Sequence, residues 1–151
     1  MTLLIYCKNQ NKSIGREISH YPDLVIIDPL RTNAFDKSWF NHEMQVVIYT
    51  SHLGKYSILN FNWKEAIDNN PKIKFIIYYS GKDLEEIKDW MIKNKFDHPI
   101  LFDPEKRFYS KNVKDRVSSI AYILRDNRII KASNPSIPSF QEDLNNLIQD
   151  K

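Results

Sequence analysis

The chain has 151 residues, 42% of them hydrophobic, and a formal net charge of +3, which together indicate one globular domain with enough apolar surface for a core. Basic residues alternate with acids along the sequence, which argues against a nucleic-acid partner, because such a partner needs lysines and arginines gathered on one face. The single cysteine, Cys7, excludes an internal disulfide and a cysteine-based zinc site, and no apolar run approaches the ~20 residues that span a bilayer.

The residue pattern at the amino terminus favours a flexible tether. An apolar run ends at Cys7, and the polar stretch KNQNKS follows it. This order is similar to the end of a bacterial lipoprotein signal, in which the cysteine carries the lipid, although the run is short and Tyr6 is large for its place before that cysteine. The alternative is an edge strand with a buried cysteine. We expect residues 1–13 to be a lipoprotein-signal remnant with its tether, and residues 14–151 to form a single domain.

The first half of this domain begins with two short strands, expected over residues 15–21 and 23–28, and continues through an irregular connection. The run VVIYT at 46–50 is apolar throughout and predicts a buried strand. The apolar residues that follow are spaced like one face of a helix, which should end before Pro71. They are Leu59, Trp63, Ala66 and Ile67.

A second strand and helix follow directly. The run KIKFIIYYS at 72–80 predicts another buried strand. Asp83 and Glu86 form a capping box for a helix whose inner face carries Leu84, Ile87 and Met91.

The last third of the chain predicts a short strand, a hairpin and a helix. HPILFD is the short strand, and PEKRFYSKN is a turn with one helical turn. The segments SSIAYIL and RIIKAS form an antiparallel pair around the tight turn RDN. Ser139 and Glu142 cap a final helix with an apolar stripe.

The order of these elements predicts the fold class. Strands that alternate with helices are joined by parallel crossovers, and the helices must pack on the faces of the sheet. The hairpin adds antiparallel strands at one side. We therefore expect an α/β three-layer sandwich with a central mixed sheet and an amino-terminal β extension.

Three segments together resemble the thioredoxin-like superfamily, nearest its branch of peroxiredoxins and membrane-tethered thiol-disulfide oxidoreductases. They are VVIYTSHLGKYSILNFNWKEAI, KFIIYYSGKDLEEIKDWMIKNKFDHPILFDPEKRF and AYILRDNRIIKASNP. The resemblance covers roughly residues 14 to 149. A closer similarity is to small envelope lipoproteins with an anchor cysteine, a GREI motif and an NP dipeptide before the last helix. Here these are Cys7, Gly15-Arg16-Glu17-Ile18 and Asn134-Pro135.

The chain departs from this superfamily at the redox loop. Redox members carry a C-x-x-C at a helix start, before a tryptophan that matches Trp63, and this places the pair on Leu53 and Tyr56, in the sequence Leu53-Gly54-Lys55-Tyr56. The cis-proline that faces the cysteines is also replaced, here by Ser118 and Ser119. Disulfide exchange and peroxidase chemistry both need a thiolate, which this loop lacks.

Other chemistries find little support in the sequence. Copper delivery on this fold uses two cysteines and a histidine, and only His52 lies near the loop. The four histidines have no metal-ligand spacing, so neither a metal nor another cofactor is expected. Ser118 and Ser119 lack the context of a nucleophile elbow, and their hydroxyls are expected to bond to backbone. No catalytic residue is therefore predicted.

The resemblance implies a binding role. We expect a redox-inactive envelope protein, lipid-anchored at Cys7 and facing the periplasm, that binds an unidentified protein or peptide partner. The candidate groove comprises His52, Leu53, Gly54, Lys55, Tyr56, Ser118 and Ser119, with a helix amino terminus at 52–56. The alternatives are a thiol-disulfide oxidoreductase or peroxiredoxin-like enzyme of unusual type, a purely structural lipoprotein, and a cytoplasmic location.

Overall fold

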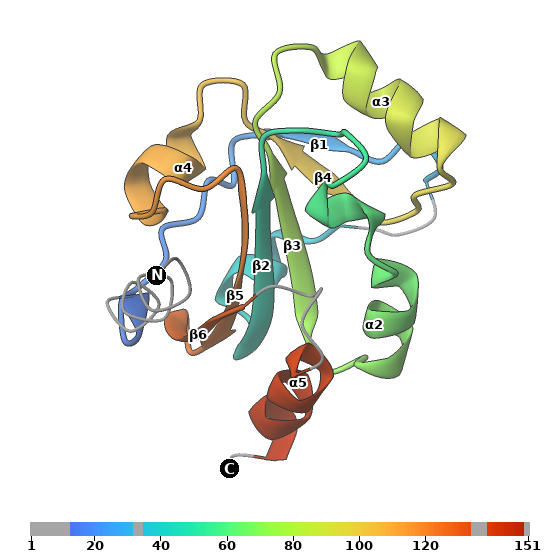
Figure 1. Ribbon diagram of the computed structural model, residues 1–151. Coiled ribbons are helices and arrows are strands. Elements are labelled where there is room, and N and C mark those ends of the chain that lie inside the picture. Colours follow the sequence, from blue (N-terminus) through green and yellow to red (C-terminus); the bar gives the residue numbers. More distant parts are fainter. Residues whose placement is uncertain (1–12, 32–34, 134–138, 150–151) are drawn as a thin grey trace.

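A six-stranded mixed sheet forms the centre of the computed structural model, which describes residues 13–31, 35–133 and 139–149 (Figure 1). The strand order is β1-β4-β3-β2-β5-β6. Strands β2, β3 and β4 run parallel, while β1, β5 and β6 each pair antiparallel to a neighbour. The strands are β1 (Val25–Ile27), β2 (Met44–Thr50), β3 (Lys74–Tyr79), β4 (Ile100–Phe102), β5 (Ser119–Arg125) and β6 (Arg128–Ser133).

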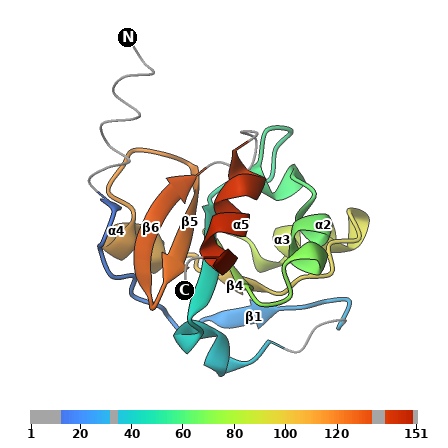
Figure 2. The same ribbon diagram turned by 90° about the horizontal axis from the view of Figure 1, so that it is seen from below.

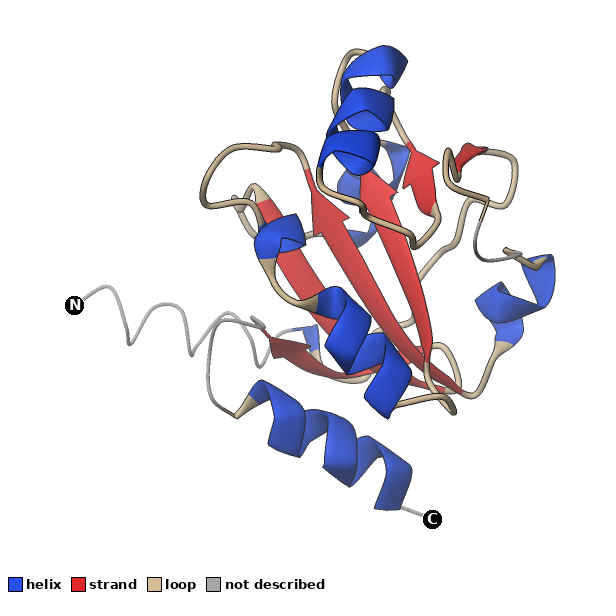
Figure 3. Ribbon diagram, turned by 90° about the vertical axis from the view of Figure 1, so that its right-hand side faces the viewer, coloured by secondary structure: helices blue, strands red, loops and turns tan. Residues whose placement is uncertain are grey.

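Helices cover both faces of the sheet, which completes the predicted three layers (Figures 1 and 2). Three helices lie on one face and contribute to the same core cluster: α2 (Trp63–Asn69), α3 (Leu84–Lys93) and α5 (Phe140–Gln149). On the other face lie α4 (Arg107–Asn112) and a 3₁₀ helix, Lys37–Asn41. Figure 3 shows the same arrangement by secondary structure.

The central strands β2 and β3 are largely apolar, because helices cover both faces of the sheet at these strands. In β2, Val46, Val47 and Ile48 are all 0% exposed, and their side chains alternate between the two core clusters. The continuous apolar runs of the sequence therefore predicted buried central strands correctly. Within the described ranges, no helix combines the length and the apolarity that a membrane crossing requires.

Asp83 caps α3 as predicted, although through the Glu85 N–H and not the Glu86 N–H of a capping box, and the predicted β5–β6 turn is present. The Asp83 side chain accepts a hydrogen bond of 2.8 Å from the Glu85 backbone N–H at the start of α3. In the β5–β6 turn, Asp126 and Asn127 both have positive φ, at 50° and 64°. Asp and Asn tolerate this left-handed backbone, which matches the twist of a two-residue hairpin.

The amino-terminal strands differ from the expectation. Residues 15–21 make only one isolated bridge, Glu17 with Arg128, instead of a strand. Beyond it, the Asn112 side chain accepts from the Ser19 N–H at 2.8 Å and donates to the Ser19 carbonyl at 2.9 Å, which turns the chain toward α4. The bridge still lies along the outer edge of β6 and covers part of it. The second expected strand, 23–28, is shortened to β1.

Candidate functional site

The loop that replaces the redox motif follows β2 and lies at the top of the sheet in Figure 1. Leu53 and Tyr56 both belong to this loop, but the expectation that they occupy a first helical turn is wrong. A 3₁₀ helix begins only at Ile58, and the α-helix α2 begins at Trp63. The loop therefore has no helix amino terminus that could hold an anion or lower a pKa.

Two side-chain caps explain why the helix starts late. Ser57 Oγ accepts from the Leu59 N–H at 3.2 Å and starts the 3₁₀ turn. Asn62 Oδ1 then accepts from the Glu65 N–H at 3.3 Å and starts α2. Each cap favours the start of a new helix at its own position, so the segment forms two short helices and not one continuous helix. The predicted apolar face is nevertheless correct, because its members reach the same core.

The structure brings the loop and the serine pair together at the edge of the sheet. The Ser51 N–H donates to the Ser118 carbonyl at 3.0 Å. One residue earlier, Thr50 Oγ1 lies 2.9 Å from Ser119 Oγ. The start of β5 is thus fastened to the end of β2 by hydroxyl and backbone groups, at the place where thioredoxin-like redox proteins, by the resemblance above, carry cysteines and a cis-proline.

The tip of the loop is exposed. Tyr56 is 86% exposed, and the Lys55 ammonium lies 5.5 Å from the centre of its ring. Leu53 instead packs against the core. Asn60 holds the tip in place, because its Nδ2 donates to the carbonyls of Gly54 at 3.0 Å and Lys55 at 2.9 Å.

The segment FDKSWF does not fill this site. Phe35, Trp39 and Phe40 pack into the cluster on the α4 face of the sheet, where the Phe40 ring lies tilted at 45° to His20 with 4.9 Å between ring centres. Tyr56 points to solvent as well, so neither this segment nor Tyr56 fills the groove.

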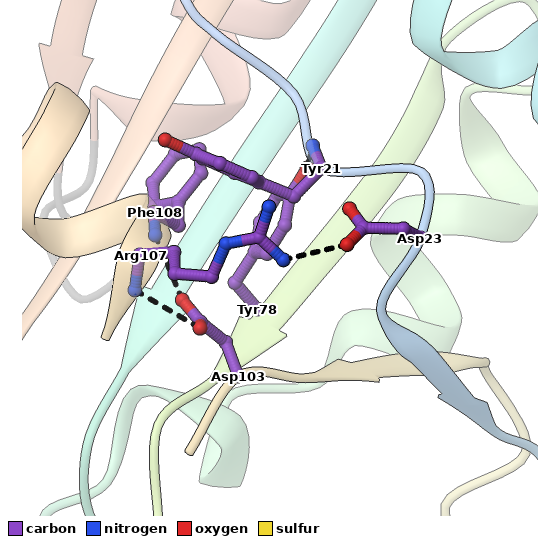
Figure 4. Close-up of polar contacts among 6 residues, drawn as sticks. All are labelled: Tyr21, Asp23, Tyr78, Asp103, Arg107 and Phe108. Carbon is purple, nitrogen blue, oxygen red and sulfur yellow. Dashed lines mark hydrogen bonds and ion pairs between the residues drawn. The ribbon is translucent and has the colours of Figure 1, made fainter. Parts of the chain in front are cut away.

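A polar cluster on the α4 face was missed by sequence reasoning (Figure 4). The buried Asp103 carboxylate accepts from the backbone N–H groups of Arg107 at 3.0 Å and Phe108 at 2.8 Å. The Arg107 guanidinium stacks on Tyr21 at 4.5 Å and donates to Asp23 at 2.7 Å, which lowers the pKa of that carboxyl. Only the Asp103 cap had a local signal, since Asp23 and Arg107 are far apart in sequence.

A second missed network ties the amino-terminal segment to the sheet. His20 Nε2 donates to Gln45 Oε1 at 2.8 Å, so its Nδ1 accepts from the Tyr78 hydroxyl at 2.9 Å. The Tyr21 N–H in turn donates to that hydroxyl oxygen at 3.3 Å. Burial disfavours the charged ring and lowers the pKa of His20 to about 4.

No protein-family model and no curated protein sequence matches the chain. Solved structures do. A candidate thiol:disulfide interchange protein, DsbE from Chlorobium tepidum, superposes with a TM-score of 0.64 over 89% of this chain and 94% of that one, at 11% identity. The fold is thioredoxin-like. AhpC from Mycobacterium tuberculosis gives 0.62 over 90% and 96%, at 16% identity, and PrxQ from Xylella fastidiosa gives 0.62 over 89% and 94%, at 15% identity.

This similarity shows the thioredoxin-like fold alone, and the chemistry of the site has to be argued from the side chains of this chain. In the part of the chain that the structure describes, histidine, cysteine and acidic side chains nowhere gather in threes to hold a metal ion. Three residues of the predicted lipoprotein pattern, Cys7, Asn134 and Pro135, lie outside the described residues, so the anchor stays a prediction.

Proposed function

We propose that this protein is a redox-inactive binding module with a thioredoxin-like fold, anchored in a bacterial envelope through Cys7. Its contact surface for an extended segment of a protein partner is the loop surface, defined as residues 52–56 with Ser118 and Ser119. The observation that carries the proposal is Tyr56, a large aromatic side chain left 86% exposed on a hydrogen-bonded loop.

The composition of the loop surface supports recognition over catalysis. Disulfide exchange needs a thiolate and usually a second thiol to resolve the mixed disulfide, whereas the whole chain has one cysteine. Tyrosine is enriched at the energetic centres of protein interfaces, and it supplies contact area at low entropic cost. Because Asn60 already orders the loop tip, little further ordering is needed on binding.

A position-specific cross-link tests the binding role. A photoreactive benzoylphenylalanine replaces Tyr56 in one variant and Ile92, which is 54% exposed on α3, in the matched control. We expect a discrete protein adduct from position 56 in cells that express the chain, its loss on adding Lys55→Glu, and no such adduct from position 92. Equal adducts from both positions, or none from position 56, would overturn the assignment of the loop surface.

A second assay separates binding from the enzymatic alternative. Insulin reduction by dithiothreitol should proceed at the same rate with the protein, with its Cys7→Ser variant and without either. A rate that depends on Cys7 would favour a thiol-disulfide oxidoreductase. The anchor has its own test, because mass spectrometry of the native protein should find a lipid on Cys7 at the amino terminus, and an unmodified Met1 would contradict it.

A further inference from the structure

Two adjoining hollows lie beside α2, apart from the side chains of the loop surface. The larger, of about 310 Å³, lies between α2 and the end of α3 and includes Trp63 and Trp90 in its wall. The smaller, of about 170 Å³, includes Trp39. Ile67 and His98 belong to both walls. All three tryptophans of the chain therefore line these hollows.

Partly buried aromatic rings form much of the larger hollow. Trp90 and Phe96 lie 5.3 Å apart between ring centres at an interplanar angle of 53°, and Phe61 meets Trp63 edge-on at 5.0 Å. Phe61, Trp90 and Phe96 each remain partly exposed. Such rings offer faces and edges to a planar aromatic guest. The volume suits a ligand with one or two rings.

The charges around the hollows favour an anionic ligand. The larger hollow has two lysines and one acid, of which Lys64 lies 3.2 Å from Asp68 and 3.8 Å from Asp97. Lys95 is exposed in the wall of this hollow and makes no side-chain hydrogen bond or ion pair among the described residues. The smaller hollow adds Lys74, whose ammonium lies over Trp39 at 5.1 Å. A ligand carboxylate is the group that would pair with the free Lys95 ammonium.

His98 supplies a second, independent sign of a ligand. The residue is 4% exposed, and its Nε2 donates to the Phe75 carbonyl at 2.6 Å. Burial lowers the pKa of His98, so the ring is neutral at pH 7 and its Nδ1 is a bare acceptor. This nitrogen is buried and has no hydrogen-bond partner within the described structure. Buried acceptors in native proteins are normally satisfied, and an N–H or O–H donor would satisfy this one.

We propose that the larger hollow binds a small aromatic carboxylate that also carries a hydroxyl or N–H donor. The ring lies among Phe61, Trp90 and Phe96, and the carboxylate pairs with Lys95. The donor reaches His98 Nδ1 after a small shift of the wall, because this nitrogen is closed to solvent in the structure. This site uses none of the loop-surface side chains, so it goes beyond the proposed function and each of the two can fail without the other.

Three probes of matched size test the ligand class on the full chain. They are 4-hydroxyphenylacetate, the amine analogue tyramine, and the non-planar carboxylate cyclohexylacetate. We expect calorimetry to give saturable binding of the first with a Kd on the order of 0.1 mM, at least tenfold tighter than the other two. The indole N–H signals of Trp63 and Trp90 should shift in NMR spectra as binding saturates. Binding of tyramine as tightly as the carboxylate, or no saturation by any probe, would overturn the proposal.

A pair of lysine variants localises the carboxylate. Lys95 and Lys106 are both exposed and both have left-handed backbone, with φ of 51° and 55°, a conformation that asparagine tolerates. Lys95→Asn should weaken binding about tenfold, whereas Lys106→Asn, outside the hollow, should leave it unchanged. Equal affinities of the two variants would show that the carboxylate does not pair with Lys95.

Discussion

The phenol ring of Tyr79 lies against Gly81, two residues further along the chain. A Cβ on Gly81 would stand 2.0 Å from the Tyr79 hydroxyl oxygen and 2.2 Å from its Cζ. Tyr79 is 2% exposed and belongs to the core under α3, so its ring has little room to yield. This contact fixes the turn by which the chain leaves β3 and enters α3.

Gly81→Ala is therefore expected to destabilise the fold by roughly 1–3 kcal/mol, the range for a forced overlap in a packed region. Urea denaturation followed by circular dichroism measures the loss. Gly54→Ala is the matched control, because a Cβ at Gly54 would have no atom within 4 Å. If both variants unfold at the same urea concentration, the Tyr79 ring does not hold this turn.

The stability should also depend on pH through His20. Its pKa falls from 6.5 in the unfolded chain to about 4 in the fold, so between these values the unfolded state binds more protons. The contribution of His20 is complete above pH 6.5 and is lost as the pH falls to 4, a change of about 3 kcal/mol.

Denaturant titrations at several pH values check this dependence. His98 also has a lowered pKa and changes stability in the same direction, so the wild type must be compared with His20→Gln. The variant keeps a polar side chain without a titrating ring, and its curve should be flatter over the window. Parallel curves for the two proteins would mean that the His20–Tyr78 bond does not couple to protonation.

The sequence predicts the strands and helices that are determined by local pattern. β2 and β3 are continuous apolar runs, and α3 has both a cap and an apolar stripe, so each carries its own signal. The start of α2 was missed, because Ser57 and Asn62 divide one apolar pattern into a 3₁₀ turn and a shorter helix. Serines and asparagines also occur within loops without capping a helix, so the sequence pattern alone does not distinguish one continuous helix from a 3₁₀ turn followed by a shorter helix.

The candidate site was predicted only in part, because its geometry depends on distant partners. The sequence indicates the loop 52–56 and the pair Ser118 and Ser119, but not that Tyr56 is exposed while Leu53 packs inward. It gives no sign that the Arg107 guanidinium would reach Asp23, since no local pattern links them. Such contacts depend on the order of the strands in the sheet, and no local pattern in the sequence reveals that order.

Loss of the Asn60 amide should loosen the loop surface without unfolding the protein. Asn60→Ala removes the two hydrogen bonds to the carbonyls of Gly54 and Lys55, which are exposed, so the cost should stay below about 1 kcal/mol. Hydrogen–deuterium exchange of residues 54–57 should become faster. Asn94→Ala is the control, since it removes one amide bond at the end of α3 and should leave exchange in this loop unchanged.

The hydroxyl pair that joins β2 to β5 gives a test of the site's rigidity. Thr50 is 0% exposed, and its Oγ1 lies 2.9 Å from Ser119 Oγ and donates to the His52 carbonyl at 3.2 Å. Thr50→Val keeps the side-chain shape but removes these bonds, and we expect a loss of about 1–2 kcal/mol. A double-mutant cycle with Ser119→Ala isolates the hydroxyl pair, and its coupling energy should be about 1 kcal/mol. Additive losses would mean that the two strand ends are held by the β2–β5 ladder and the Ser51–Ser118 bonds, without a contribution from the hydroxyl pair.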